Sequence, residues 1–298
     1  MTKRPQITIH MGDAKTGTTS LQTLLFDNRE ALRGHGVVYA DSGRIVPRAI
    51  GHHQLPKSLY AEDSPADLAQ SPPWADLKKE IADLPAGMRM ILSSEGFSSL
   101  NSAGDAARLA AFFDGCDVSF LLCVRKPDAW IESMYQQNVK GAPFSCNPFD
   151  LFQRAFELRG YVAGGLLADA FGDASVDAMI YQGDVVGGLL ARLGLAEVLG
   201  YSGGARENIR QPEILTHAFL ALNHVEMPMQ ARRQLYRSIT ETVTAKSTGA
   251  LSPRVAFPPL GFVDDDQRRA YLAAKRPLVQ AFCNRFGLSF AELYGEDA

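Results

Sequence analysis

The sequence has few cysteines, no excess of basic charge and no long apolar segment. The spacing of its 4 cysteines matches neither a metal site nor a redox motif, so we expect buried, reduced thiols. Lys and Arg number 30 against 33 Asp and Glu, and a net charge of −3 excludes the basic character of a general nucleic-acid-binding protein. No apolar run approaches the roughly 20 residues of a membrane span, and the N-terminal residues have no signal-peptide pattern. We therefore expect a soluble, cytoplasmic protein.

The order of the expected strands and helices predicts an α/β fold. Strands alternate with helices in the first two thirds of the chain, and the segments after Pro212 have helical spacing only. The strand expected over 118–124 is almost wholly apolar, as is typical of a parallel sheet covered on both faces. We predict three layers around a central parallel sheet, similar to P-loop NTPases. A single domain would span residues 1–298, with a core over about 6–200 and a helical C-terminal extension over about 201–298.

Residues 7–25 combine a strand, a glycine-bearing loop and the start of a helix. This arrangement holds phosphate groups through backbone N–H groups and the helix dipole. The spacing from Gly12 to Gly17 fits the Walker A pattern G-x-x-x-x-G-K-[ST], except that Thr18 stands at the lysine position and Lys15 lies inside the loop. The usual lysine reaches the β- and γ-phosphates of a nucleoside triphosphate. The displaced lysine therefore favours a shorter anionic group.

The run 15–19 (KTGTT) at the end of this strand resembles the 5′-phosphosulfate loop of sulfotransferases that use 3′-phosphoadenosine 5′-phosphosulfate (PAPS). Arg125 at a strand end and Ser133 on the next helix are similar to the 3′-phosphate element of that family. In such an element the arginine guanidinium donates paired hydrogen bonds to phosphate oxygens, and the serine hydroxyl donates a further hydrogen bond. Residues 181–184 (YQGD) resemble the family's Tyr-Glu-Asp turn. The resemblance covers about residues 6–185 and is to the prokaryotic branch.

The resemblance implies a role for each of these residues. Lys15 would stabilise the bridging oxygen as charge develops on it, and no metal would be required. Arg206 lies with Asn208 and Arg210 in the loop where the family completes its nucleotide pocket, and Leu21 replaces the aromatic residue that often stacks on adenine. The residues implied to bind the nucleotide are Lys15, Thr16, Gly17, Thr18, Thr19, Ser20, Arg125, Ser133 and Arg206.

Transfer to an acceptor hydroxyl or amine also needs a general base. Glu95 follows the strand expected over 88–93, at the carboxyl edge where ligands bind in open α/β folds, and is the leading candidate. His52 and His53 are its rivals, because histidine titrates in the useful pH range. The acceptor would be a small molecule or a glycan, and the segments 40–73 and 141–170 would shape its pocket. Residues 40–73 are rich in Gly, Ser and Pro, and we expect them to be irregular.

Two other functions stay open at this point. A P-loop-type small-molecule kinase would share the strand, loop and helix but would use Mg²⁺-ATP, and the sequence has no acidic Walker-B strand end at the expected place. A non-catalytic nucleotide-binding module would keep Lys15 and Arg125 but would not depend on Glu95 or on the two histidines.

Overall fold

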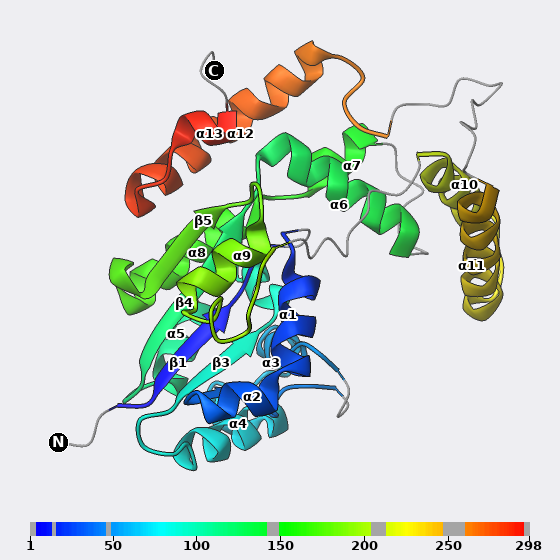
Figure 1. The fold of residues 1–298 in the computed structure, drawn as a ribbon. Coiled ribbons are helices and arrows are strands. Elements are labelled where there is room, and N and C mark those ends of the chain that lie inside the picture. Colours follow the sequence, from blue (N-terminus) through cyan, green and yellow to red (C-terminus); the bar gives the residue numbers. More distant parts are fainter. Residues whose placement is uncertain are drawn as a thin grey trace. The chain divides into compact units, whose positions relative to one another are not determined.

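The structure is a computed structural model that describes residues 4–13, 16–45, 49–141, 149–203, 213–246 and 260–294 (Figure 1). The chain divides into two compact units. The first contains Met1–Lys126, Leu158–Glu207 and Lys275–Ala298, and the second contains Pro127–Glu157 and Asn208–Ala274. The organisation as one domain over residues 1–298 stays a prediction.

A five-stranded parallel sheet forms the centre of the first unit. Its strands are β1 (Gln6–His10), β2 (Val37–Tyr39), β3 (Arg89–Ser93), β4 (Asp117–Val124) and β5 (Val176–Ile180). They lie in the order β2-β3-β1-β4-β5, and all neighbours are parallel. β1 is therefore the middle strand. The register places its last residue, His10, beside Ser93 of β3 and Leu121 of β4, so three chain segments meet at this carboxyl edge.

Helices cover both faces of the sheet (Figure 1). On one face α1 (Thr18–Asp27), α2 (Arg29–Gly34) and α9 (Val185–Arg192) share a hydrophobic cluster with residues of the strands. On the other face lie α5 (Ala103–Phe112) and α8 (Arg159–Phe171), and Phe171 packs against Phe120 of β4. The helix α4 (Pro72–Ala82) joins this layer through Trp74, whose ring contacts Phe112. The predicted three-layer α/β fold is confirmed.

The described elements of the second unit are all helices, and those after Pro212 confirm the predicted helical C-terminal part. It contains α6 (Pro127–Gly141), α7 (Phe149–Ala155), α10 (Glu213–Asn223), α11 (Met229–Lys246) and the beginning of α12 (Asp265–Phe286). The buried guanidinium of Arg232 donates to the carbonyl oxygens of Leu222 and Val225, at 2.6 and 2.7 Å. A cation at a helix C-terminus is favourable, and this contact joins α10 to α11. The rest of α12, with α13 (Phe290–Tyr294), belongs to the first unit.

Two segments differ from the elements expected from sequence. The helix after the β1 loop is divided at Asn28, whose side-chain amide donates to the Leu24 carbonyl and competes with helix continuation. Residues 40–73 are not irregular throughout: they contain α3 (Gln54–Leu59) and a 3₁₀ turn at Leu68–Gln70. Leu55 and Leu59 are fully buried, so tertiary packing stabilises α3 where the composition indicated a loop.

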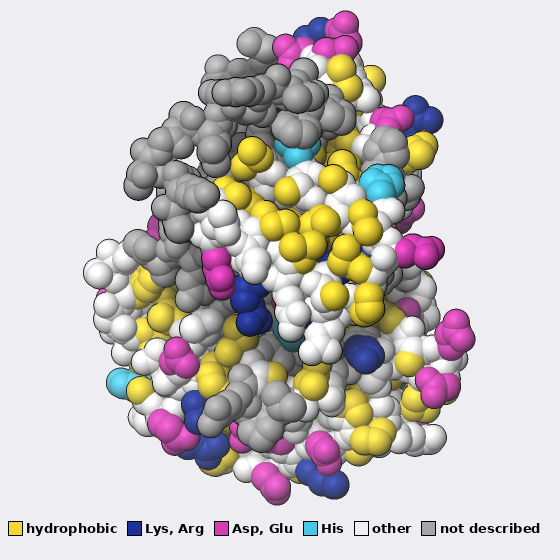
Figure 2. Space-filling view, turned by 90° about the vertical axis from the view of Figure 1, so that its right-hand side faces the viewer, with side chains coloured by type: hydrophobic (Ala, Val, Ile, Leu, Met, Phe, Trp, Pro, Cys, Tyr) yellow, Lys and Arg dark blue, Asp and Glu magenta, His cyan; other side chains and the backbone are white. Residues whose placement is uncertain are grey.

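None of the described helices combines the length and the apolar character needed to cross a membrane. On the face in Figure 2, basic and acidic side chains are interspersed. Cys116, Cys123 and Cys283 are free thiols, and burial raises the pKa of Cys123 to about 12. Cys146 lies outside the described residues.

Candidate functional site

The loop between β1 and α1 leaves the start of α1 without a side-chain cap. Gly17 is the N-cap residue, with a φ of 79°, and no side chain caps the helix among the described residues. A side chain at this position would be strained, and its Cβ would lie 2.7 Å from Val185 of α9. The first N–H groups of an α-helix have no partner inside the helix. The start of α1 can therefore receive an anion.

Buried polar side chains surround Gly12 beside this helix start. A Cβ at Gly12 would lie 2.9 Å from both His10 Nε2 and Thr16 Oγ1, and 3.3 Å from Thr18 Oγ1. The Thr16 hydroxyl donates to the Asp13 carbonyl and closes the loop. Neither His10 Nε2 nor Thr18 Oγ1 has a hydrogen-bond partner in the described part of the chain. Because leaving a buried polar group unsatisfied costs about 1–3 kcal/mol, these atoms favour a polar occupant.

The charge state of His10 follows from its burial. The ring is fully buried, and burial lowers its pKa to about 4. His10 is thus neutral near pH 7. Its Nδ1 lies 2.8 Å from the Ser93 hydroxyl, which joins the end of β1 to the end of β3.

The structure brings only part of the predicted loop site together. Thr16 and Thr18 are buried beside Gly12, Ser20 is buried in the first turn of α1, and Thr19 is exposed on that turn. Lys15, the predicted stabiliser of the bridging oxygen, lies outside the described residues, as does Arg206. Their roles stay predictions.

Arg125 follows β4 at the same edge of the sheet as the β1 loop. Its guanidinium lies over the Tyr181 ring, 5.0 Å from the centroid, and Tyr181 directly follows β5. The Tyr161 hydroxyl on α8 donates to the Arg125 carbonyl at 2.9 Å and fixes the backbone of this position. Ser133 lies on α6 in the second unit, whereas Arg125 belongs to the first. Their joint grip on a 3′-phosphate therefore stays a prediction.

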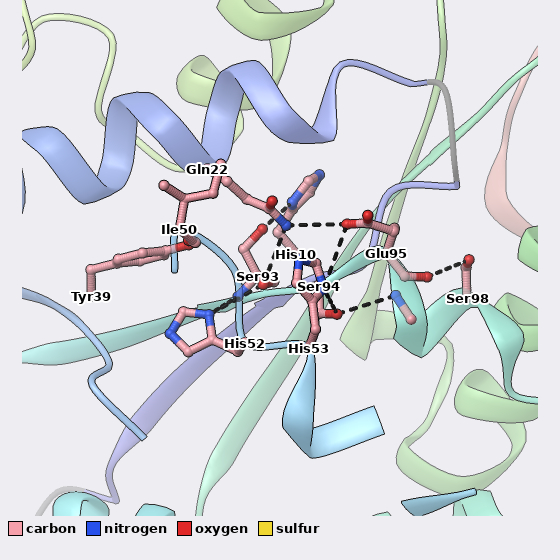
Figure 3. A network of polar contacts seen from close by, with 11 residues as sticks. His10, Gln22, Tyr39, Ile50, His52, His53, Ser93, Ser94, Glu95 and Ser98 are labelled. Carbon is pink, nitrogen blue, oxygen red and sulfur yellow. Dashed lines mark hydrogen bonds and ion pairs between the residues drawn. The ribbon is translucent and has the colours of Figure 1, made fainter. Parts of the chain in front are cut away.

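Glu95 begins the 3₁₀ helix η2 (Glu95–Ser99) directly after β3 and Ser94, and its side chain is 39% exposed (Figure 3). Its Oε2 accepts a hydrogen bond from Gln22 Nε2 of α1 at 3.3 Å. The same oxygen lies 3.9 Å from Nδ1 of His53. His53 Nδ1 is also 2.8 Å from the Ser94 hydroxyl. Glu95 and His53, two of the three candidates for the general base, are thus neighbours in one polar network.

His52 has a different environment from His53. Its Nδ1 accepts the Ser93 N–H at 2.9 Å, and its Nε2 lies 2.8 Å from the Ala40 carbonyl oxygen, to which it must donate. Burial lowers the pKa of His52 to about 4. With both ring nitrogens committed to the backbone of neighbouring segments, His52 cannot reach an acceptor. We assign it a structural role, and of the three candidates for the base only Glu95 and His53 retain that possibility.

Close packing between α3 and η2 places His53 beside Glu95. His53 precedes α3, and a Cβ at Gly96 would lie 2.6 Å from the Pro56 ring of this helix. The backbone of η2 can approach α3 this closely only because residue 96 has no side chain. The distance between His53 and Glu95 therefore depends on this contact as well as on their own hydrogen bonds.

Four residues of the network were not predicted from sequence: His10, Gln22, Ser93 and Ser94. Gln22 lies four residues after Thr18 and so on the same side of α1. His10 and Ser93 end two strands that are neighbours in the sheet. The helical spacing could have indicated Gln22, but the pairing of His10 with Ser93 requires the strand order. No group of three or more His, Cys, Asp or Glu suited to a metal ion is found within the described residues.

Comparisons with known proteins gave solved structures of low sequence identity, two of which are sulfotransferase structures. No family model matches the chain, and no curated protein sequence matches it. A sulfotransferase from Alicyclobacillus acidocaldarius is 15% identical, with 98% of this chain and 99% of that chain covered and a TM-score of 0.47. The sulfotransferase domain of the olefin synthase from Synechococcus PCC 7002 is 18% identical, with 80% and 95% covered and a TM-score of 0.39. At these scores, function has to be inferred from the chain's own residues.

Proposed function

We propose that the chain is a PAPS-dependent sulfotransferase. It would move the sulfuryl group of PAPS to a hydroxyl or amine of an acceptor, which is a small molecule or a glycan. No metal would take part. The observation that supports this most is the loop after β1, where an uncapped helix start adjoins the buried, unsatisfied polar atoms His10 Nε2 and Thr18 Oγ1.

This loop is chemically suited to a phosphate group that carries a sulfuryl substituent. The N–H groups at the start of α1 and the Thr18 hydroxyl supply donors, and the helix dipole favours negative charge. Neutral His10 can present an N–H at Nε2 when its Nδ1 accepts from Ser93. Gly12 leaves room between these groups that a larger residue would fill. Lys15 would add the single positive charge that the departing oxygen requires.

Arg125 supports the choice of a nucleotide with a second phosphate. A guanidinium binds phosphate oxygens in pairs, and its stacking on Tyr181 restricts its orientation. Because Arg125 follows β4, the immediate neighbour of β1, it stands at the same sheet edge as the loop. The 3′-phosphate of PAPS would bind Arg125, while the 5′-phosphosulfate would bind the loop.

Glu95 is our choice for the general base. The carboxylate lies at the end of β3, the other neighbour of β1, and it is partly exposed. Its Oε2 lies 3.9 Å from Nδ1 of His53 and accepts a hydrogen bond from Gln22. The three strand ends would then supply three functions: the loop after β1 for the phosphosulfate, Arg125 for the 3′-phosphate and Glu95 for the acceptor proton.

Nucleotide binding tests this function without knowledge of the acceptor. Adenosine 3′,5′-bisphosphate, the product of transfer, should bind the wild-type protein at least about tenfold more tightly than AMP, because even one charged hydrogen bond is worth roughly 1.5–3 kcal/mol. Calorimetry with and without Mg²⁺ measures both affinities. Equal affinities would contradict the proposal, and tighter binding of Mg²⁺-ATP than of the bisphosphate would indicate a kinase.

Turnover separates an enzyme from a nucleotide-binding module. PAPS is incubated with panels of phenols, alcohols, amines and sugars, and release of adenosine 3′,5′-bisphosphate is followed for each. An acceptor-dependent release that Glu95→Gln abolishes supports transfer. Tight bisphosphate binding without release for any panel member would favour the module.

A further inference from the structure

Gln22 connects the helix that follows the loop to the carboxylate at the end of β3. Its side chain is almost completely buried. The Nε2 amide group donates to two oxygens: the Ser93 carbonyl at 3.4 Å and Glu95 Oε2 at 3.3 Å. Both amide hydrogens are thereby used, one on the strand end and one on the carboxylate (Figure 3). Gln22 thus ties the Glu95 side chain to the backbone of β3.

The two oxygens of Glu95 have different surroundings. Oε2 receives Gln22 and faces His53, whereas Oε1 has no hydrogen-bond or ion-pair partner among the residues that the structure describes. The Glu95 side chain as a whole is 39% exposed, so a molecule from outside can reach the carboxylate. An anchored oxygen within a carboxylate that can be reached is what a directed proton acceptor needs.

Gly51 restricts the position of the Gln22 side-chain amide. A Cβ at Gly51 would lie 2.5 Å from His53 Nε2 and 2.9 Å from Gln22 Nε2. The backbone of Gly51 therefore forms a wall against both side chains. Gln22 has little room to turn its amide away from Glu95.

We infer that Gln22 is a positioning residue for the transfer reaction: it fixes Oε2 of Glu95 so that Oε1 accepts the proton of the acceptor. This inference rests on the proposed function. The acceptor oxygen or nitrogen forms a bond to sulfur while its proton passes to Oε1. The bond between sulfur and the bridging oxygen breaks, and its electron pair leaves with adenosine 3′,5′-bisphosphate. Gln22 lies one turn after Thr18 on α1. The helix whose start would bind the phosphosulfate of PAPS would therefore also orient the Glu95 carboxylate.

Gln22→Met tests the role in turnover, because methionine keeps the length of the side chain and removes both donors. We expect kcat with the best acceptor of the panels to fall about 10–100-fold, the range expected for a misplaced catalytic group, with the KM for PAPS unchanged. Gln280→Met is the matched control: it removes an amide that donates to Asn284 on the surface of α12. This control should keep the full kcat.

A double-mutant cycle separates positioning from a general structural effect. In the Glu95→Gln background the proton acceptor is already lost, so adding Gln22→Met should lower kcat no further. An equal loss in both backgrounds would overturn the inference, because Gln22 would then act independently of Glu95.

A measurement on the free protein distinguishes failure of this inference from failure of the proposed function. The side-chain amide signals of Gln22 in a ¹H–¹⁵N spectrum, identified by their absence in Gln22→Met, should shift in Glu95→Ala, while those of Gln280 should not. Unmoved Gln22 signals overturn the inference even if PAPS is turned over. Shifted signals in a protein that neither binds the bisphosphate nor turns over PAPS overturn the proposed function, and the catalytic role of Gln22 with it.

Discussion

Nδ1 of His53 lies 3.9 Å from Oε2 of Glu95. The same nitrogen is 2.8 Å from the Ser94 hydroxyl, whose oxygen also accepts the Gly96 N–H. The hydroxyl hydrogen of Ser94 is therefore available to Nδ1 of a neutral imidazole, which would carry its own proton on Nε2 against Gly51. In that state Nδ1 is already occupied, whereas Oε1 of Glu95 has no partner among the described residues and the side chain is partly exposed. This arrangement favours Glu95 over His53 as the base.

The assignment of the base can be tested by replacing each residue. Glu95→Gln keeps the shape and can still meet Gln22, but the amide cannot accept a proton, so we expect turnover to fall about 10²–10⁴-fold. His53→Gln replaces only a neighbour of the carboxylate and should cost less. Steady-state rates measured together with bisphosphate affinity separate chemistry from binding. A large loss in His53→Gln beside a small loss in Glu95→Gln would assign the base to His53.

Gly12→Ala tests the space beside the helix start. The added methyl group would lie 2.9 Å from His10 Nε2 and Thr16 Oγ1, two side chains that are buried and have little freedom to move. We expect bisphosphate affinity to fall at least about tenfold, the loss of roughly one charged hydrogen bond. Calorimetry gives this affinity.

Gly165→Ala is the control for that substitution. A Cβ at Gly165, inside α8, would meet nothing within 4 Å, and alanine is the better helix former by about 1 kcal/mol. This variant should bind the bisphosphate normally and unfold at a slightly higher temperature. Normal binding by Gly12→Ala would show that the space around His10 is not part of the nucleotide site.

Lys15→Ala tests the residue predicted from the loop sequence. Loss of one charge that stabilises the transition state typically costs about 10²–10³ in rate, and we expect transfer to be lost while the thermal unfolding midpoint is kept. Lys79→Ala removes an exposed lysine of α4 that pairs with Asp76, and it should leave the rate unchanged. A Lys15→Ala protein with near-normal turnover would remove this lysine from the mechanism.

The parts of the site that could be predicted from sequence are those that local patterns determine. Gly12, Gly17 and the threonines indicate the loop because turn geometry and helix capping act over a few residues. The strand ends at Arg125 and Glu95 follow from apolar runs. No local sequence pattern shows that β3 and β4 flank β1. This strand order places Glu95, the β1 loop and Arg125 at the same edge of the sheet.

The different roles of the two adjacent histidines could not be predicted from sequence. The sequence does not distinguish His52 from His53 as a candidate for the general base, because both lie in a segment of loop-like composition. Burial separates them: His52 is sealed between the backbone of Ala40 and Ser93, and His53 remains partly exposed beside Glu95. Tertiary packing, which also makes α3 helical, decides this difference.

The burial of His52 predicts how stability changes with pH. Its pKa is about 4 in the folded protein and 6.5 ordinarily, so the unfolded chain binds the extra proton between these values. Between about pH 4 and pH 6.5 the free energy of unfolding must then rise by about 1.4 kcal/mol per pH unit because of this residue. Above pH 6.5 the contribution of His52 to stability is fully present. Between pH 7.5 and pH 5 the contribution lost is about 2 kcal/mol.

Urea unfolding of His52→Gln checks this expectation. The variant is less stable at pH 7.5, because glutamine cannot reproduce both backbone hydrogen bonds, but its loss of stability towards pH 5 should be smaller than that of the wild type by about 2 kcal/mol. His35→Gln replaces an exposed histidine at the end of α2 and should keep the wild-type difference. An unchanged pH difference in His52→Gln would mean that His52 is not buried in its neutral form.

Arg125→Ala makes the sharpest distinction among the functions considered. If Arg125 binds the 3′-phosphate, the variant should lose most of the preference for adenosine 3′,5′-bisphosphate over AMP, while AMP binding is barely altered, because AMP has no group there. The loss is about tenfold or more for one charged hydrogen bond. Arg192→Ala, which removes an exposed arginine of α9 that pairs with Asp177, is the control and should keep the preference. Calorimetry on the wild type and both variants with each nucleotide gives the comparison. If Arg125→Ala weakens AMP and the bisphosphate equally, the arginine acts on the 5′ side or through the Tyr181 contact, and its assignment to the 3′-phosphate is wrong.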